Sequence, residues 1–180
     1  MRKRDIVKGN YFGSKATSGL CQPIIALMPP HDTYIETHLG GGAIMLRKPP
    51  ALRNIGVDLD PASLARLECH YPVEKVHGCA HQFLREFSFH GRELVYCDPP
   101  YPHHTRSSKR RYRFEYTEQD HVQLLKLLTE LDCAVMLSGY PSALYGHCSA
   151  SPTNSIRGIL CAPAVKRINC AADPPACRAC

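Results

Sequence analysis

Tryptophan is absent from the 180-residue sequence, and no apolar run approaches the ~20 residues that a membrane-spanning helix needs. The charged segment 1–5 is not followed by the apolar core of a secretory signal, so we expect a cytoplasmic protein. Internal repeats are also missing, which argues against solenoids and propellers. With 44% hydrophobic and 21% charged residues, the composition is that of an ordinary globular protein.

Two common nucleotide-binding patterns are missing as well. The glycines Gly40, Gly41 and Gly42 are not followed by the Lys-Ser/Thr pair of a triphosphate-binding loop. They also lack the Gly-x-Gly-x-x-Gly spacing of dinucleotide-binding proteins. The glycines still allow the backbone to approach a ligand closely. The pattern therefore disfavours a nucleoside triphosphate or a dinucleotide as that ligand.

Positive charge is concentrated in one part of the chain, which we call the basic segment (residues 102–116). Its five cations and single acid, Glu115, supply +4 of the formal net charge of +6. Such a concentration predicts a polyanionic partner, and the alternative is a solvated loop. The five cations are Arg106, Lys109, Arg110, Arg111 and Arg113.

Cysteine is abundant, with ten residues, but it shows no clear metal-binding pattern. Six cysteines are scattered without regular spacing and are expected to be reduced, mostly buried thiols. Among the last four, only the final pair has the C-x-x-C spacing of a zinc site. We therefore expect no bound metal. These four are Cys161, Cys170, Cys177 and Cys180.

Segments typical of strands and helices alternate along the chain, which predicts an α/β fold whose mostly parallel sheet has helices on both faces. Residues 1–148 are expected to form one domain, and 149–180 an irregular tail with little ordered structure. A helix is predicted to begin after Asp60, with Pro61 in its first position, and to run to about His70, and another helix is predicted to begin after Thr117. The predicted strands are 33–36, 54–58, 73–77, 94–97 and 133–137, and the other predicted helices are 43–48 and 81–87.

The apolar strand 94–97 ends in Asp98, Pro99, Pro100 and Tyr101, which we call the Asp-Pro-Pro-Tyr corner. The prolines fix two φ angles and make the corner rigid. A carboxylate and a carbonyl held there can accept both N–H groups of an exocyclic amine, while Tyr101 stacks on its ring. This arrangement is typical of a site for a base flipped out of a duplex, and the alternative is an incidental turn.

At these residues the chain resembles the Dam-like (D12 class) DNA adenine N6-methyltransferases. The motif 11–15, the glycine loop (residues 36–43) and the segment 56–60 resemble further motifs of that family, in the same order. The resemblance spans roughly residues 8–140. It implies a Rossmann-like methyltransferase fold, S-adenosylmethionine as the cofactor and adenine in double-stranded DNA as the substrate. We expect a monomer.

The resemblance also implies roles for individual residues. Asp98, Pro99, Pro100 and Tyr101 would form the catalytic corner. Asp58, at the end of strand 54–58, would accept the ribose hydroxyls, with Asp60 more suited to capping the following helix. Lys15 would lie near the cofactor or the DNA backbone, and the five cations of the basic segment would contact DNA. The residues expected to contact the cofactor are Tyr11, Lys15, Glu36, Gly40, Gly41, Gly42, Asp58 and Asp98.

Three features depart from that family. Gly78 and Cys79 stand where a Gly-Asp pair is usual, and a cysteine is a poor acceptor. Only residues 88–92 occupy the place of a recognition module, so recognition would fall on the basic segment. The C-terminal end lacks the usual Glu, Trp and Asn segment, so we expect this end of the fold to be atypical.

Two other functions remain open at this point. The same site would serve an RNA adenine methyltransferase, and the irregular tail is compatible with a non-catalytic nucleic-acid-binding remnant of the fold. Asp98 argues against two related activities, because protein glutamine methylation uses Asn at this place and cytosine N4 methylation tends to use Ser.

Overall fold

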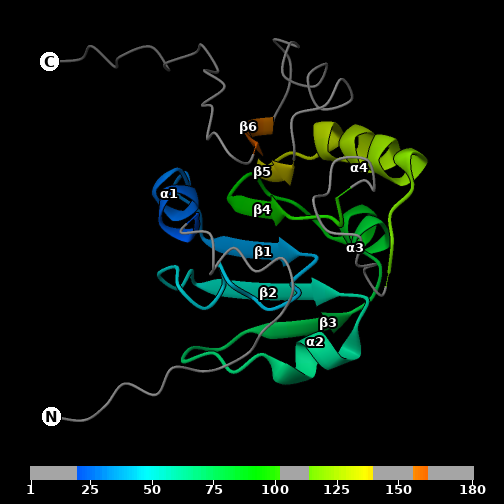
Figure 1. Ribbon diagram of the computed structural model, residues 1–180. Coiled ribbons are helices and arrows are strands. Elements are labelled where there is room, and N and C mark those ends of the chain that lie inside the picture. Colours follow the sequence, from blue (N-terminus) through cyan, green and yellow to red (C-terminus); the bar gives the residue numbers. More distant parts are fainter. Residues whose placement is uncertain (1–19, 102–113, 140–155, 162–180) are drawn as a thin grey trace, which may run out of the picture.

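The computed structural model describes residues 20–101, 114–139 and 156–161, and for 156–161 only the backbone. The described part contains one six-stranded sheet in which every neighbouring pair is parallel, in the order β3-β2-β1-β4-β5-β6 (Figure 1). This confirms the predicted α/β fold with a parallel sheet. The strands are β1 (Thr33–Thr37), β2 (Arg53–Asp58), β3 (Glu74–His77), β4 (Glu93–Cys97), β5 (Ala134–Gly139) and β6 (Ile156–Cys161).

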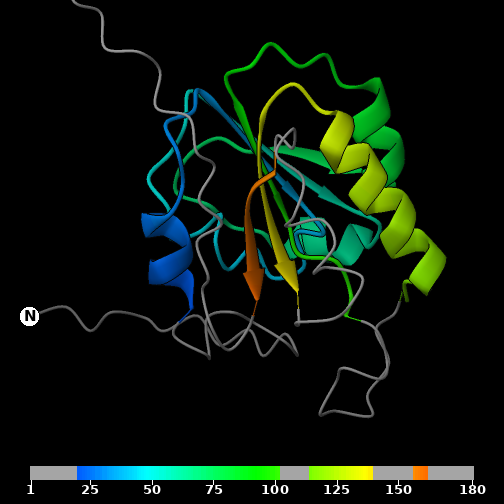
Figure 2. The same ribbon diagram turned by 90° about the horizontal axis from the view of Figure 1, so that it is seen from above.

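Helices cover both faces of this sheet, as predicted. Figure 2 shows α1 (Cys21–Ala26) on one side and α3 (Ala80–Glu86) with α4 (Glu118–Glu130) on the other. The core divides accordingly, because neighbouring strand residues such as Tyr34 and Ile35 point to opposite faces. The short helix α2 (Pro61–Arg66) contributes Leu64 to the same side as α1.

Two helices begin where the sequence predicts. Asp60 caps α2 by accepting a hydrogen bond from Ala62 N, and Pro61 occupies the first position of the helix. Thr117 caps α4 through a capping box with Asp120, in which each side chain bonds the other residue's backbone N–H. These caps satisfy backbone donors that have no partner inside the helix.

One predicted helix is wrong and one is shorter than expected. Residues 43–48 form successive turns rather than a helix. Gly42 in a left-handed conformation and the prolines at 49 and 50 confine the segment to little more than one turn. Helix α2 ends at Arg66 instead of about residue 70, because Leu67 turns to an extended conformation and packs into the core.

Strand β6 lies in the tail, where we predicted no regular structure. It extends the sheet beyond β5, with a register shift between Val135 and Met136. The prediction of an irregular tail is therefore wrong for residues 156–161. Within the described ranges, no helix has the length and apolar character needed to cross a membrane.

Candidate active site

The carboxyl ends of β2, β1 and β4 lie side by side at one edge of the sheet. Thr37, the last residue of β1, is in register with Val57 on one side and with Cys97 on the other. The glycine loop therefore starts between the strand ends that lead to Asp58 and Asp98. The chain order also reverses here, because β1 has β2 and β4 as its neighbours. Ligands of open α/β sheets bind at such a switch point.

The Asp-Pro-Pro-Tyr corner follows β4, every residue of which is buried. Pro99 is buried, while Asp98 and Tyr101 are half-buried. The hydroxyl of Tyr101 donates to Asp98 Oδ1 at 2.9 Å. The corner thus holds its aromatic ring and its carboxylate together, in addition to the rigidity that two prolines supply.

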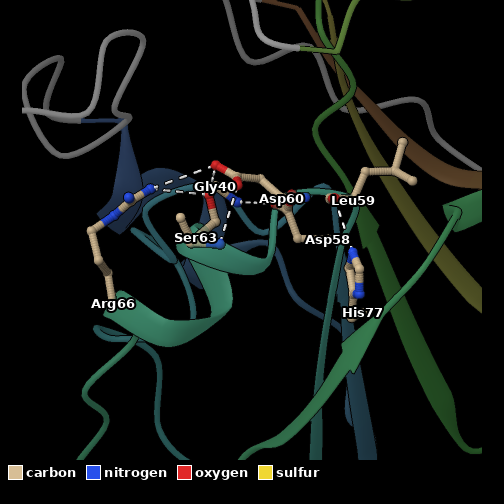
Figure 3. Close-up of polar contacts among 8 residues, drawn as sticks. Gly40, Asp58, Leu59, Asp60, Ser63, Arg66 and His77 are labelled. Atoms are coloured by element: carbon tan, nitrogen blue, oxygen red, sulfur yellow. Dashed lines mark hydrogen bonds and ion pairs between the residues drawn. The ribbon is translucent and has the colours of Figure 1, made fainter.

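Asp58 fixes the glycine loop to the end of β2 (Figure 3). Its Oδ2 accepts a hydrogen bond from Gly40 N at 2.6 Å, and its Oδ1 accepts one from Asp60 N at 2.7 Å. Asp60 has a different role, because its carboxylate caps α2 and accepts from Ser63 Oγ at 3.3 Å. Of the two acids, Asp58 is the one whose carboxylate bonds the loop.

Glu36 holds the other end of the glycine loop from inside the core. Its Oε2 accepts hydrogen bonds from Tyr34 Oη at 3.0 Å and from Met45 N at 2.8 Å. The pKa of the Glu36 carboxyl is raised to about 8, mainly by burial and to a smaller extent by the negative charge of Asp98. The two hydrogen bonds and the charge of Lys48 act in the opposite direction. At neutral pH this carboxyl is therefore mostly protonated.

Glycine is required at position 42. Its φ of +61° lies in the left-handed region, and a Cβ added there would lie 2.5 Å from Leu67 Cδ1. Gly40 also has a positive φ, of 54°. The loop therefore passes close to the core while exposing its backbone at the carboxyl edge.

A group of histidines around Tyr116 joins this edge to α3 and α4, and the sequence did not reveal it. Tyr116 Oη lies 2.7 Å from His38 Nε2 and 3.2 Å from His81 Nδ1. The ring of His121 meets that of Tyr116 edge-on, with centroids 5.4 Å apart. Burial lowers the pKa of His38 to about 3, helped by the nearby His81. One signal in the sequence could have indicated this group: His81 and His121 both lie in segments predicted to be helical, and the structure buries both side chains.

Several predicted site residues lie outside the described residues. They are Tyr11, Lys15 and all five cations of the basic segment: Arg106, Lys109, Arg110, Arg111 and Arg113.

Among the part of the chain that the structure describes, no group of three His, Cys, Asp or Glu side chains could hold a metal ion.

The described edge brings together three predicted carboxyl groups, those of Glu36, Asp58 and Asp98. Burial is the main cause of the raised pKa of Glu36, but Asp98 also contributes, so these two acids lie close enough to interact and would both favour a positive charge nearby. The acceptors and the exposed glycine backbone fit a ligand that carries positive charge and hydroxyl groups. No protein-family model matches the chain, and no curated protein matches it significantly.

Proposed function

We propose that this protein is a DNA methyltransferase that transfers a methyl group from S-adenosylmethionine to N6 of adenine. One observation carries the proposal: the glycine loop and the Asp-Pro-Pro-Tyr corner follow the neighbouring strands β1 and β4 at one edge of the sheet. A cofactor bound over the loop would therefore lie beside a base bound at the corner.

The corner supplies what an aromatic amine needs in order to react. The N6 lone pair of adenine is delocalised into the ring, which makes the amine a weak nucleophile. Hydrogen bonds from N6–H to the Asp98 carboxylate and the Pro99 carbonyl would favour the pyramidal geometry that localises the lone pair. S-adenosylmethionine supplies a methyl group that its sulfonium already activates. The protein's contribution is positioning and electrostatics.

Tyr101 would take two positions in this scheme. Without a base, its hydroxyl bonds Asp98 Oδ1. In the proposed complex, Tyr101 would stack on adenine and N6–H would replace its hydroxyl as a donor to Asp98 Oδ1. The Tyr101 hydroxyl would therefore occupy the Asp98 acceptor until the base displaces the hydroxyl.

The cofactor would be held by the acids below the glycine loop. Asp58 already bonds Gly40 N, and its remaining lone pairs can accept ribose hydroxyls. Glu36 is neutral while the site lacks a cation, because its pKa is about 8. A cationic ligand would favour the ionised form of Glu36, so the binding of the ligand would release a proton.

A labelled-methyl assay tests the proposal. The full-length protein is incubated with tritiated S-adenosylmethionine and either duplex DNA or structured RNA, and the modified nucleoside is identified. We expect N6-methyladenine in DNA. Methylation of RNA alone would identify an RNA enzyme, and no transfer to either, with the cofactor bound, would indicate a non-catalytic binding protein.

The variant Asp98→Ala assigns the chemistry to the corner. We expect it to abolish transfer while calorimetry still detects cofactor binding. Asp32→Ala is the matched control, because Asp32 is an exposed acid at the opposite ends of the strands, where it pairs with Arg92. Normal turnover by Asp98→Ala would rule out the mechanism.

A further inference from the structure

A continuous chain of hydrogen bonds runs from the end of β4 to the first turn of α4. Thr37 Oγ1 lies 3.0 Å from Cys97 Sγ and 3.1 Å from His38 Nδ1. His38 Nε2 and His81 Nδ1 both meet Tyr116 Oη, at 2.7 and 3.2 Å. His81 Nε2 lies 3.1 Å from the backbone carbonyl oxygen of Asp120. The chain thus links five side chains through groups that can donate or accept.

The backbone carbonyl of Asp120 fixes the direction of the hydrogen bond at one end of this chain, because a carbonyl oxygen can only accept. His81 Nε2 therefore carries a hydrogen. If His81 is neutral, its Nδ1 must accept from the Tyr116 hydroxyl. The oxygen of Tyr116 then accepts from His38 Nε2–H. His38 Nδ1 in turn accepts from the Thr37 hydroxyl, whose single hydrogen is then no longer available for its bond to Cys97 Sγ.

A second proton on His81 reverses every one of these directions. His81 Nδ1–H now donates to Tyr116, whose hydroxyl donates to His38 Nε2. His38 must then carry its hydrogen on Nδ1 and donate it to Thr37. The Thr37 hydroxyl donates to Cys97 Sγ. The two arrangements differ by one proton, on His81, and every other member keeps its number of hydrogens.

The groups that face His81 have opposing effects on its charge. On α4, Asp120 carries a carboxylate whose pKa is lowered by its hydrogen bonds from Thr117 and further by His81 and His121, so this carboxylate favours the charged form. The nearby His38 and His121 would oppose a charge if they were protonated. Among the described residues, Tyr116 and Cys79 are further titratable neighbours, and Cys79 Sγ lies 3.9 Å from His81 Nδ1.

We propose that His38 and Tyr116 are positioning residues, through which one proton on His81 switches the Thr37 hydroxyl from donating to His38 to donating to Cys97. Thr37 and Cys97 are the last residues of β1 and β4, so Thr37 lies within the glycine loop, three residues before Gly40, and Cys97 directly precedes Asp98. His38 has a φ of 60°, a conformation that is costly for a residue with a side chain and is maintained only by its surroundings. The effect on methyl transfer rests on the proposed function, whereas the reversal itself does not.

Nitrogen-15 NMR of the histidine rings tests the reversal without any activity. In the full-length protein, we expect His38 to change from the Nε2–H to the Nδ1–H tautomer at the pH where His81 takes up its second proton. His31, near the opposite ends of the strands, is the internal reference and should not follow that midpoint. A His38 tautomer that stays constant over the whole pH range in which the protein remains folded would overturn the proposal.

Two variants separate the relay from general stability. Tyr116→Phe keeps the ring that stacks on His81 but removes the hydroxyl, so His38 should no longer follow His81. His81→Gln cannot take up the second proton, so it should leave His38 in one tautomer at every pH. If the His38 tautomer still changes with pH in either variant while the variant remains folded, the proposed path is wrong.

The pH dependence of methyl transfer then tests the positioning role. Wild-type kcat should change at the His81 midpoint, and Tyr116→Phe should lose that inflection while its KM for the cofactor changes less than threefold. If NMR detects the reversal but the inflection survives in Tyr116→Phe, the positioning role is wrong. An inactive wild-type protein that still shows the reversal would contradict the proposed function instead.

Discussion

The Asp58 carboxylate and the Gly40 backbone N–H form a hydrogen bond of 2.6 Å that joins the end of β2 to the glycine loop. Glu36 makes a second such bond to Met45 N, just beyond the other end of the loop. Both acceptors come from the strands, which are more rigid than loops. The loop is therefore held in place before a ligand arrives, which reduces the entropy that binding must remove.

Changing Asp58 to Ala should weaken cofactor binding. The change removes an acceptor for the ribose and also releases Gly40 N, so we expect a loss of roughly 1.5–3 kcal/mol, or about 10- to 150-fold in Kd. Calorimetry with S-adenosylmethionine measures it, with Asp32→Ala as the control. If Kd is unchanged, the ribose contact belongs to another acid, of which Asp60 is the nearest alternative.

Gly42→Ala should destabilise the fold itself. The added methyl group would lie 2.5 Å from Leu67 Cδ1, at a φ that alanine adopts only with strain. We expect a loss of about 1–3 kcal/mol in the free energy of unfolding, measured by urea denaturation. The matched control is Gly78→Ala, because Gly78 has no atom within 4 Å of an added Cβ and is not in the left-handed region. Equal effects of the two variants would contradict this account of the glycine loop.

Glu36 should make stability depend on pH below neutrality. Its folded pKa of about 8 exceeds its usual 4.5, so the folded state binds this proton more tightly. The stabilisation is complete below about pH 4.5 and is lost as pH rises through 8, with a slope of up to about 1.4 kcal/mol per pH unit. Glu36→Gln should remove this slope between pH 5 and 7, as measured by urea denaturation at each pH. An identical slope in wild type and variant would show that another group is responsible.

The strands and helix starts could be predicted because their causes are local. The run from Leu94 to Cys97 is apolar because both faces of β4 are covered, and Asp60 and Thr117 cap helices through neighbouring backbone atoms. Strand β6 was not predicted, because a six-residue segment with Gly158 inside it carries little periodicity. Its place in the sheet depends on pairing with β5, which is remote in sequence.

The candidate site also contains parts that the sequence could predict and parts that it could not. The motifs at 36–43, 58 and 98–101 indicated which strand ends to compare, and the sheet brings those ends together. The sequence could not indicate that Tyr116 would bond His38 and His81, which lie 78 and 35 positions away. Such contacts depend on how α3 and α4 pack on the sheet. No local pattern records that packing.

The cations of the basic segment should contact DNA phosphates. They begin five residues after Tyr101, and a base held at the corner remains joined to its backbone, so phosphates must pass nearby. Each phosphate contact contributes about 0.9 to the slope of log affinity against log salt for duplex DNA. Changing Arg110 and Arg111 together to Ala should therefore flatten the slope by up to about 1.8, and should weaken all sequences alike. Fluorescence anisotropy with labelled duplexes at several salt concentrations measures both effects. The control variant is Arg53→Ala, which removes a cation at the opposite ends of the strands. A changed sequence preference would mean that one of the two arginines contacts bases, and an unchanged slope would place the DNA elsewhere.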